Sequence, residues 1–387
     1  MPVIVGLGLF YAAIFIGSGA SLPFMPVWLG GEGLSGTQIA IIVSAPQFAR
    51  TVLGPAIALW ADGFRLRRTP MIWLGAGSAL AYASMAVLHG FWWWLIGWFL
   101  GTTFLGALSP LADVITLRRS GRHGFAYALP RSVGSMAYIC GNVGMGLILL
   151  AAPSLAVLVW TVTAASLAAL GARLLLPPDP VHEHPAPSGR KADLLAGLRG
   201  LLADRAFVLA VVSNGLIQAS HGFYYSFSAL AWRRQGLAEG WIGALWGFAV
   251  GAEVLFMWFL EPWRRRVGPE ALVVIGGLGA IVRWTALAFS PPLALLFPIQ
   301  ALHALSFTAT FLGSLRLIER LSPPASATAA QTLNSSVANG VLTGLATMAS
   351  GPLFDAAGTR GYLSMTAMAA AGLAGALWSL RRVRARP

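Results

Sequence analysis

The sequence contains very little cysteine and few charged residues. Cys140 is the only cysteine among 387 residues, so an intramolecular disulfide and a cysteine-rich metal site are both excluded. Charged residues make up 10% of the chain, whereas soluble domains contain about 25%. Hydrophobic residues make up 57%. This composition excludes an ordinary soluble domain and favours a membrane protein.

Several sequence motifs of enzymes and pumps are also missing. We find no paired-aspartate metal motif, no Gly-x-Ser-x-Gly nucleophile motif, no Cys/His cluster and no phosphate-binding loop. The chain is therefore not expected to be an enzyme or an ATP-driven pump, and no cofactor is expected. A polytopic membrane enzyme remains a remote alternative.

Long apolar segments are abundant, and twelve of them are long enough to be membrane spans. A helix needs about 20 residues to cross the hydrocarbon core. The sequence thus predicts an all-α polytopic membrane protein with spans at 4–29, 37–60, 70–89, 91–117, 126–151, 154–176, 206–231, 241–260, 270–289, 293–315, 326–352 and 360–380. The start of the chain lacks a basic segment and a small-residue cleavage site, so the first span is expected to be retained.

Basic residues collect in alternate loops. Most of the 26 lysines and arginines follow even-numbered spans, and only Arg233, Arg234 and Arg360 fall in the opposite loops. The positive-inside rule then places both termini in the cytoplasm, here of a bacterial inner membrane. Because the net charge of +13 is divided among short loops rather than gathered on one face, nucleic acid is not an expected partner.

The one long interruption between spans is 177–205, which begins with Pro177, Pro178, Asp179 and Pro180. It predicts a six-helix bundle at 1–176, a cytoplasmic linker at 177–205, and a second bundle at 206–387 that ends in a short tail. An acidic residue followed by three arginines occurs after span 2 and again after span 8, which are corresponding places in the two halves. Such a repeat is expected if the chain arose by duplication of a six-helix unit. The alternative is that any cytoplasmic loop collects arginines.

Five charged residues lie well inside the predicted spans, where hydrocarbon makes a charge costly. They are Arg50, Asp113, Arg131, Glu253 and Arg283. Asp113 and Arg131 lie at similar depth, which predicts an ion pair. Glu253 lies eight residues from Glu261, so it is roughly 12 Å deep and suited to carry a proton. The surplus positive charge favours binding of a substrate carboxylate.

Polar residues follow helical spacing in several spans. One stripe in the seventh span runs through Asn214, Gln218, His221, Tyr225 and Ser228. We predict a central cavity faced by such stripes, although hydrogen bonding between helices is the alternative for each uncharged member. The candidate substrate-binding residues are Arg131, Arg283, His221, His303, Gln218, Tyr225, Gln300 and Asn334, and the candidate proton-coupling residues are Glu253 and Asp113.

The twelve spans, the central linker and the Asp62-x-x-Arg65 loop together resemble the major facilitator superfamily. In that loop, Gly63 stands one place earlier than the family's pattern has it. The resemblance implies that Asp62 and Arg65 form a loop that acts in conformational change. Segments 216–229, 251–254, 282–284 and 300–303 are similar to the phenylpropionate permease group of proton symporters, as are 110–113 and 131–135.

The charge layout is also similar to that of lactose permease, another member of the superfamily. In that relative, an acid follows the span-10 histidine by one turn, but here Ala304, Leu305, Ser306 and Phe307 follow His303. The proton-carrying role of the missing acid must then pass to another group. A second departure, at Tyr127–Pro130, leaves the substrate open.

These observations predict a proton symporter that moves a small aromatic or other monocarboxylate by alternating access. A sugar or nucleoside symporter, or an exporter, is the alternative within the superfamily. The expected partners are the small-molecule substrate and the lipid bilayer, the energy source is the proton gradient, and the protein is expected to function as a monomer.

Overall fold

The structure is a computed structural model that describes residues 2–181 and 199–384. Within these ranges the chain is helical, and its single β-bridge joins Leu66 to Pro180. The described residues form two compact units. Unit 1 takes those of Met1–Pro185 and Ser226–Gly247, and unit 2 takes those of Ala186–Tyr225 and Phe248–Pro387.

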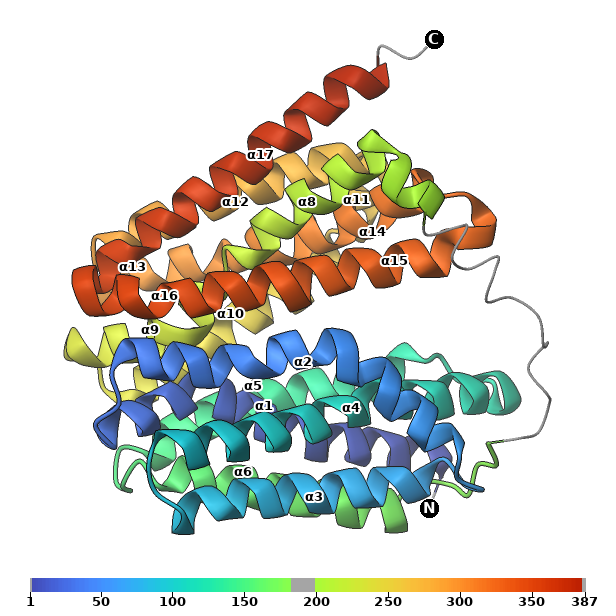
Figure 1. Cartoon of the computed structure of the whole chain (residues 1–387), viewed down its shortest axis with the longest axis vertical. Helices are drawn as coiled ribbons and strands as arrows, with labels where there is room; N and C mark the ends of the chain where they lie inside the picture. Colours follow the sequence, from blue (N-terminus) through green and yellow to red (C-terminus); the bar gives the residue numbers. More distant parts are fainter. Residues whose placement is uncertain (1, 182–198, 385–387) are drawn as a thin grey trace. The chain divides into compact units, whose positions relative to one another are not determined.

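Six long helices of unit 1 coincide with the first six predicted spans (Figure 1). Helix α1 packs along α5 and α6, and α3 packs along α4 and α6. The bounds are α1 (Val3–Gly31), α2 (Gly36–Asp62), α3 (Arg68–Val87), α4 (Phe91–His123), α5 (Ala128–Ile148) and α6 (Ala156–Leu174).

Glycines allow α1 and α5 to approach closely. A Cβ atom added at Gly19 would lie 3.1 Å from the Cα atom of Tyr138, and one added at Gly141 would lie 3.2 Å from the backbone nitrogen of Ala20. A Cβ at Gly134 would lie 2.7 Å from the ring of Phe15. Small residues at these crossings bring the two backbones together, as is common in membrane bundles. The α5 face that carries Arg131 is therefore held against α1.

The second half of the chain also consists of helices, and several of them are short. Its helices are α8 (Arg205–Ala219), α9 (Gly222–Arg234), α10 (Glu239–Phe259), α11 (Glu261–Arg266), α12 (Pro269–Ala288), α13 (Leu293–Ala301), η1 (Ala304–Ala309), α14 (Thr310–Arg320), η2 (Pro324–Ser326), α15 (Ala327–Ser335), η3 (Ser336–Leu342), α16 (Thr343–Ala357), η4 (Gly358–Gly361) and α17 (Tyr362–Arg384). Figure 1 shows α17 lying along α12, and these two helices are in contact in unit 2.

Three spans predicted as continuous helices are interrupted. The seventh breaks at Ser220–His221, between α8 and α9. The tenth contains η1 and the eleventh contains η3, both of which are π-helical turns. Such turns are rare in proteins and occur frequently at functional sites. The seventh span keeps part of its predicted stripe across the break, since Tyr225 stacks on His221 and His221 contacts the backbone oxygen of Gln218.

Nine helices within the described ranges are long and apolar enough to cross a membrane. The segments predicted as the fifth, eleventh and twelfth spans are helical as well. The chain is thus a multi-pass membrane protein. Its division at 177–205 into two six-helix bundles remains a prediction, and residues 182–198 of that linker lie outside the described residues.

Candidate functional site

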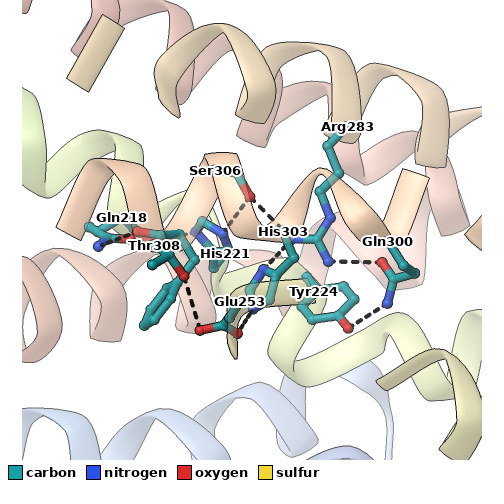
Figure 2. Close-up of polar contacts among 10 residues, drawn as sticks. Gln218, His221, Tyr224, Glu253, Arg283, Gln300, His303, Ser306 and Thr308 are labelled. Atoms are coloured by element: carbon teal, nitrogen blue, oxygen red, sulfur yellow. Dashed lines mark hydrogen bonds and ion pairs between the residues drawn. The ribbon is translucent and has the colours of Figure 1, made fainter. Parts of the chain in front are cut away.

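The buried polar network of unit 2 centres on Arg283, which lies on α12 and is 0% exposed (Figure 2). One terminal nitrogen of the guanidinium lies 2.6 Å from Nδ1 of His303 and also donates to the Ser306 hydroxyl at 3.3 Å. The other donates to the side-chain oxygen of Gln300 at 2.8 Å. The Arg283 side chain thus joins α12 to α13, through Gln300, and to η1, through Ser306.

Aromatic rings cover the guanidinium of Arg283. Its Cζ atom lies 4.4 Å from the ring centre of Tyr224 and 4.6 Å from that of Trp284. Gln300 donates to the Tyr224 hydroxyl at 2.7 Å, which fixes that ring. Cation–π contacts stabilise a desolvated cation, so Arg283 can stay charged although it contacts only the side chains of His303, Ser306 and Gln300 in these hydrogen bonds.

His303 connects Arg283 to Glu253. Its Nε2 atom lies 2.9 Å from Oε1 of Glu253, a residue of α10 whose side chain is 14% exposed. A guanidinium only donates hydrogen bonds, so Nδ1 of His303 must accept the one from Arg283. The imidazole is then neutral and donates from Nε2 to the Glu253 carboxylate. The second carboxylate oxygen accepts from the Thr308 hydroxyl at 3.2 Å.

His221 ends a second branch of the same network. Its Nδ1 lies 2.9 Å from the backbone oxygen of Gln218, and its Nε2 lies 3.1 Å from the Ser306 hydroxyl. A carbonyl oxygen only accepts, so Nδ1 carries the proton and Nε2 accepts from Ser306. Both branches therefore run outward from Arg283 in a fixed donor-to-acceptor direction.

Unit 1 contains the predicted pair of Asp113, on α4, and Arg131, on α5. The Nε atom of Arg131 lies 3.8 Å from Oδ1 of Asp113, and the side chains are 32% and 30% exposed. Asp113 also accepts from the hydroxyls of Tyr11 at 2.6 Å and Tyr127 at 2.9 Å. The Arg131 guanidinium lies 4.3 Å from the ring centre of Phe15. The pair is direct and partly accessible.

Other predicted site residues have different partners. Asn214 and Asn334 both donate to the Ser314 hydroxyl, at 3.2 Å and 3.1 Å, and so join α8, α14 and α15. The Gln218 side chain donates to the backbone oxygen of Phe307 at 3.3 Å. The ring of Tyr225 stacks on His221 with centres 5.7 Å apart. Their substrate-binding roles and the central cavity remain predictions.

In the loop predicted to act in conformational change, Asp62 forms an ion pair with Arg67 at 3.7 Å. The roles of Asp62 and Arg65 in conformational change remain a prediction. Arg67 also lies 3.4 Å from the fully buried carboxylate of Asp179, which Arg118 and Arg119 approach to 3.6 Å and 3.1 Å. The sequence assigned Asp179 to a linker, yet its carboxylate joins the segment after α6 to Arg67 in the α2–α3 loop and to the end of α4.

Sequence reasoning missed Tyr224, Ser306, Thr308, Tyr11 and Tyr127. The uncharged residues after His303 gave no signal because a π turn, invisible in hydropathy, decides which of them face Glu253. Tyr224 was passed over because it lies one residue outside the stripe that was drawn through His221 and Tyr225. Tyrosines inside the first and fifth spans were a signal that could have been used. Among the described residues, no group of His, Cys, Asp and Glu is placed to hold a metal ion.

Comparison with known proteins places these sites in a family context. The protein-family model described as "MFS_1 like family" matches residues 4–364 of this chain. The chain is 27% identical over 324 residues to the "Probable 3-phenylpropionic acid transporter" of Escherichia coli K12, covering 81% of each chain. It is 29% identical over 360 residues to the "Maltose permease" of Geobacillus stearothermophilus, covering 90% of this chain and 86% of that one.

Solved structures of transporters share the fold. The nucleoside transporter NupG aligns with a TM-score of 0.85 at 15% identity, covering 98% of this chain and 99% of that one. The human organic anion transporter MFSD10 aligns with a TM-score of 0.62 at 18% identity, covering 97% of this chain and 100% of that one. These likenesses establish the architecture and leave the substrate open.

Proposed function

Because the chain belongs to the MFS_1 like family, and is thus a secondary transporter of the major facilitator superfamily, we propose that it moves a small organic anion across the membrane together with protons. The family and the all-helical fold predicted from the sequence are confirmed. The proton gradient supplies the energy in this proposal, and no cofactor is required. The protein works as a monomer in a bacterial inner membrane, with both termini in the cytoplasm.

The relay from Arg283 through His303 to Glu253 is the observation that carries the proposal. While Glu253 is ionised, the relay is electrically balanced, with one cation and one anion joined by a neutral imidazole. A proton on Glu253 removes the anion and leaves the buried Arg283 uncompensated. A buried cation without a counter-ion is costly, so the positive charge of Arg283 attracts an incoming carboxylate more strongly after protonation than before it. This order, proton first and anion second, couples the two movements.

Arg131 is the proposed anchor for the substrate carboxylate. It is about one-third exposed, and its contact with Asp113 is a long one through Nε. A guanidinium can also hold a carboxylate through two parallel hydrogen bonds. The rings of Phe15 and Tyr11 lie beside it, at 4.3 Å and 5.4 Å, which suits an aromatic acid. The relative named as a probable 3-phenylpropionic acid transporter supports the same substrate class.

Symport of a sugar or a nucleoside is the second candidate function. The observation that favours it is the chain's likeness to a maltose permease and to the fold of a nucleoside transporter. Export of either class of substrate is a further alternative within the same superfamily.

Purified protein in liposomes can separate these candidates. We expect an imposed proton gradient to drive accumulation of radiolabelled 3-phenylpropionate, but not of maltose or uridine. Glu253→Gln, which mimics the protonated acid, should keep exchange of 3-phenylpropionate without a gradient and lose gradient-driven accumulation. Glu239→Gln is the matched control, since Glu239 begins the same helix and pairs with Arg233 at 3.3 Å.

Two results would contradict the proposal, and a third would invalidate the assay. Accumulation of maltose or uridine in place of 3-phenylpropionate would favour the second candidate. Gradient-driven accumulation by Glu253→Gln equal to that of the unaltered protein would remove Glu253 as the coupling residue and leave His303 or His221. Loss of exchange in Glu239→Gln as well would mean that the assay reports damage to α10.

A further inference from the structure

The π turn η1 lies directly beside the proton-coupling carboxylate. His303 precedes η1 and Thr308 is inside it, and both contact Glu253 on α10. His303 reaches Oε1 at 2.9 Å, and the Thr308 hydroxyl donates to Oε2 at 3.2 Å. Figure 2 shows the two side chains meeting the same carboxylate. Two residues five positions apart thus hold both oxygens of one group.

An ordinary helix cannot place these two side chains together. In an α-helix of 3.6 residues per turn, residues five apart point in directions about 140° apart. In a π turn the hydrogen bonds run between residues five apart and the turn is wider, so such residues point in more similar directions than they do in an α-helix. The shared contact of His303 and Thr308 with Glu253 therefore depends on the π turn.

Two glycines of α12 make room for this wider turn. A Cβ atom at Gly276 would lie 3.0 Å from the backbone oxygen of Leu305 and 3.0 Å from the backbone nitrogen of Thr310. A Cβ atom at Gly279 would lie 2.9 Å from the side chain of Leu305. These glycines of α12 thus lie against η1 at Leu305 and against Thr310, which follows η1 directly.

We infer that Thr308 is a positioning residue for Glu253, brought to its carboxylate by the π turn of η1. This inference rests on the proposed role of Glu253 in proton coupling. The other charged or titratable side chains of unit 2 that act on Glu253 are Arg283 on α12 and Tyr224 on α9. They act from other helices, and only Thr308 depends on the register of η1.

The contact stabilises one protonation state of Glu253. The hydroxyl of Thr308 and Nε2–H of His303 are both donors, and donors favour the ionised carboxylate. If η1 takes up α-helical register during transport, Thr308 rotates away and Glu253 loses one of its two donors. Proton uptake and a change in backbone register are then coupled at this turn.

The test is a pH titration of the Glu253 carboxyl by infrared difference spectroscopy on the reconstituted protein, without substrate. The protonated-carboxyl band is assigned by its loss in Glu253→Gln. Thr308→Val should move its midpoint upward by about one pH unit, the size expected for losing one hydrogen bond to a charge. Thr308→Ser, which keeps the hydroxyl, should titrate like the unaltered protein. Thr310→Val is the matched control, because the Thr310 hydroxyl has no hydrogen-bond partner among the described residues.

The π register has its own test. The double variants Phe307→Thr/Thr308→Val and Phe307→Val/Thr308→Val differ only in a hydroxyl at position 307, which an α-helix would direct towards Glu253. We expect equal midpoints for the two. Recovery of the original midpoint by the Phe307→Thr variant would overturn the dependence on the π turn.

The remaining outcomes separate this inference from the proposed function. A Glu253 band whose midpoint does not move in Thr308→Val, or moves equally in Thr310→Val, overturns the role of Thr308 and leaves the coupling role of Glu253 intact. If no band depends on Glu253, the coupling role fails and this inference fails with it.

Discussion

The two units each contain an arginine and an acid, but the two pairs are built differently. In unit 1, Arg131 meets Asp113 directly at 3.8 Å, and both side chains are about one-third exposed. In unit 2, Arg283 is fully buried, and the neutral ring of His303 stands between it and Glu253. Aromatic rings lie against both guanidinium groups.

This difference divides the work of a symporter between the two sites. A direct and accessible ion pair balances its own charge, so either partner can exchange for a substrate group at modest cost. When the acid of a buried pair is neutralised, the buried cation loses its counter-ion, and the free-energy cost of keeping that cation charged rises strongly. We therefore assign anchoring of the substrate to unit 1 and response to the proton to unit 2, and three variants test this assignment.

The largest effect is expected for Arg283→Lys. A single ammonium group cannot contact His303, Ser306 and Gln300 together or lie flat on Tyr224. We expect proton-driven accumulation of 3-phenylpropionate to fall ~100-fold or more, because the substitution breaks a buried charged network. Arg360→Lys, in the loop before α17, is the control and should transport normally. Near-normal accumulation by Arg283→Lys would end the contrast between the two sites.

A smaller effect is expected for Arg131→Lys. The charge opposite Asp113 is kept, but the planar group that can hold a carboxylate through two hydrogen bonds is lost. Affinity for 3-phenylpropionate, measured by calorimetry on purified protein, should fall about tenfold. The pH dependence of exchange should not change, since Arg131 belongs to unit 1. Unchanged affinity would show that Arg131 is not the anchor. A shifted pH dependence would show that Arg131 also affects the response to the proton, against the assignment of that role to unit 2.

The smallest effect is expected for Tyr127→Phe. Asp113 accepts from both Tyr11 and Tyr127, so one donor remains after the substitution. Loss of one hydrogen bond to a charged group should weaken 3-phenylpropionate binding only a few-fold. Tyr82→Phe is a suitable comparison, because its hydroxyl contacts Thr102 instead. A loss as large as that of Arg131→Lys would mean that Asp113, rather than Arg131, governs binding.

The buried charges themselves could be found in the sequence, but their partners could not. Glu253, Arg283 and His303 stand out because ionisable groups inside apolar segments are rare. The pair of Asp113 and Arg131 was predictable because the two residues lie at similar depth in consecutive spans. By contrast, the relay through His303 depends on the rotation of α12 relative to η1, which no residue spacing encodes. Asp179 was missed for a similar reason, since its three arginines come from the α2–α3 loop and from α4.

The sequence by itself determined that this chain spans a membrane many times, which family it resembles and which charged residues lie within the spans. Hydropathy and charge act locally along the chain, because every span must satisfy the same apolar solvent. Only the tertiary structure decided that Arg67 pairs with Asp62, and that Thr308 reaches Glu253. A change of one residue in helical register rotates a side chain by about 100°. Packing between helices selects that register, as where Gly276 and Gly279 of α12 lie against the segment that contains η1.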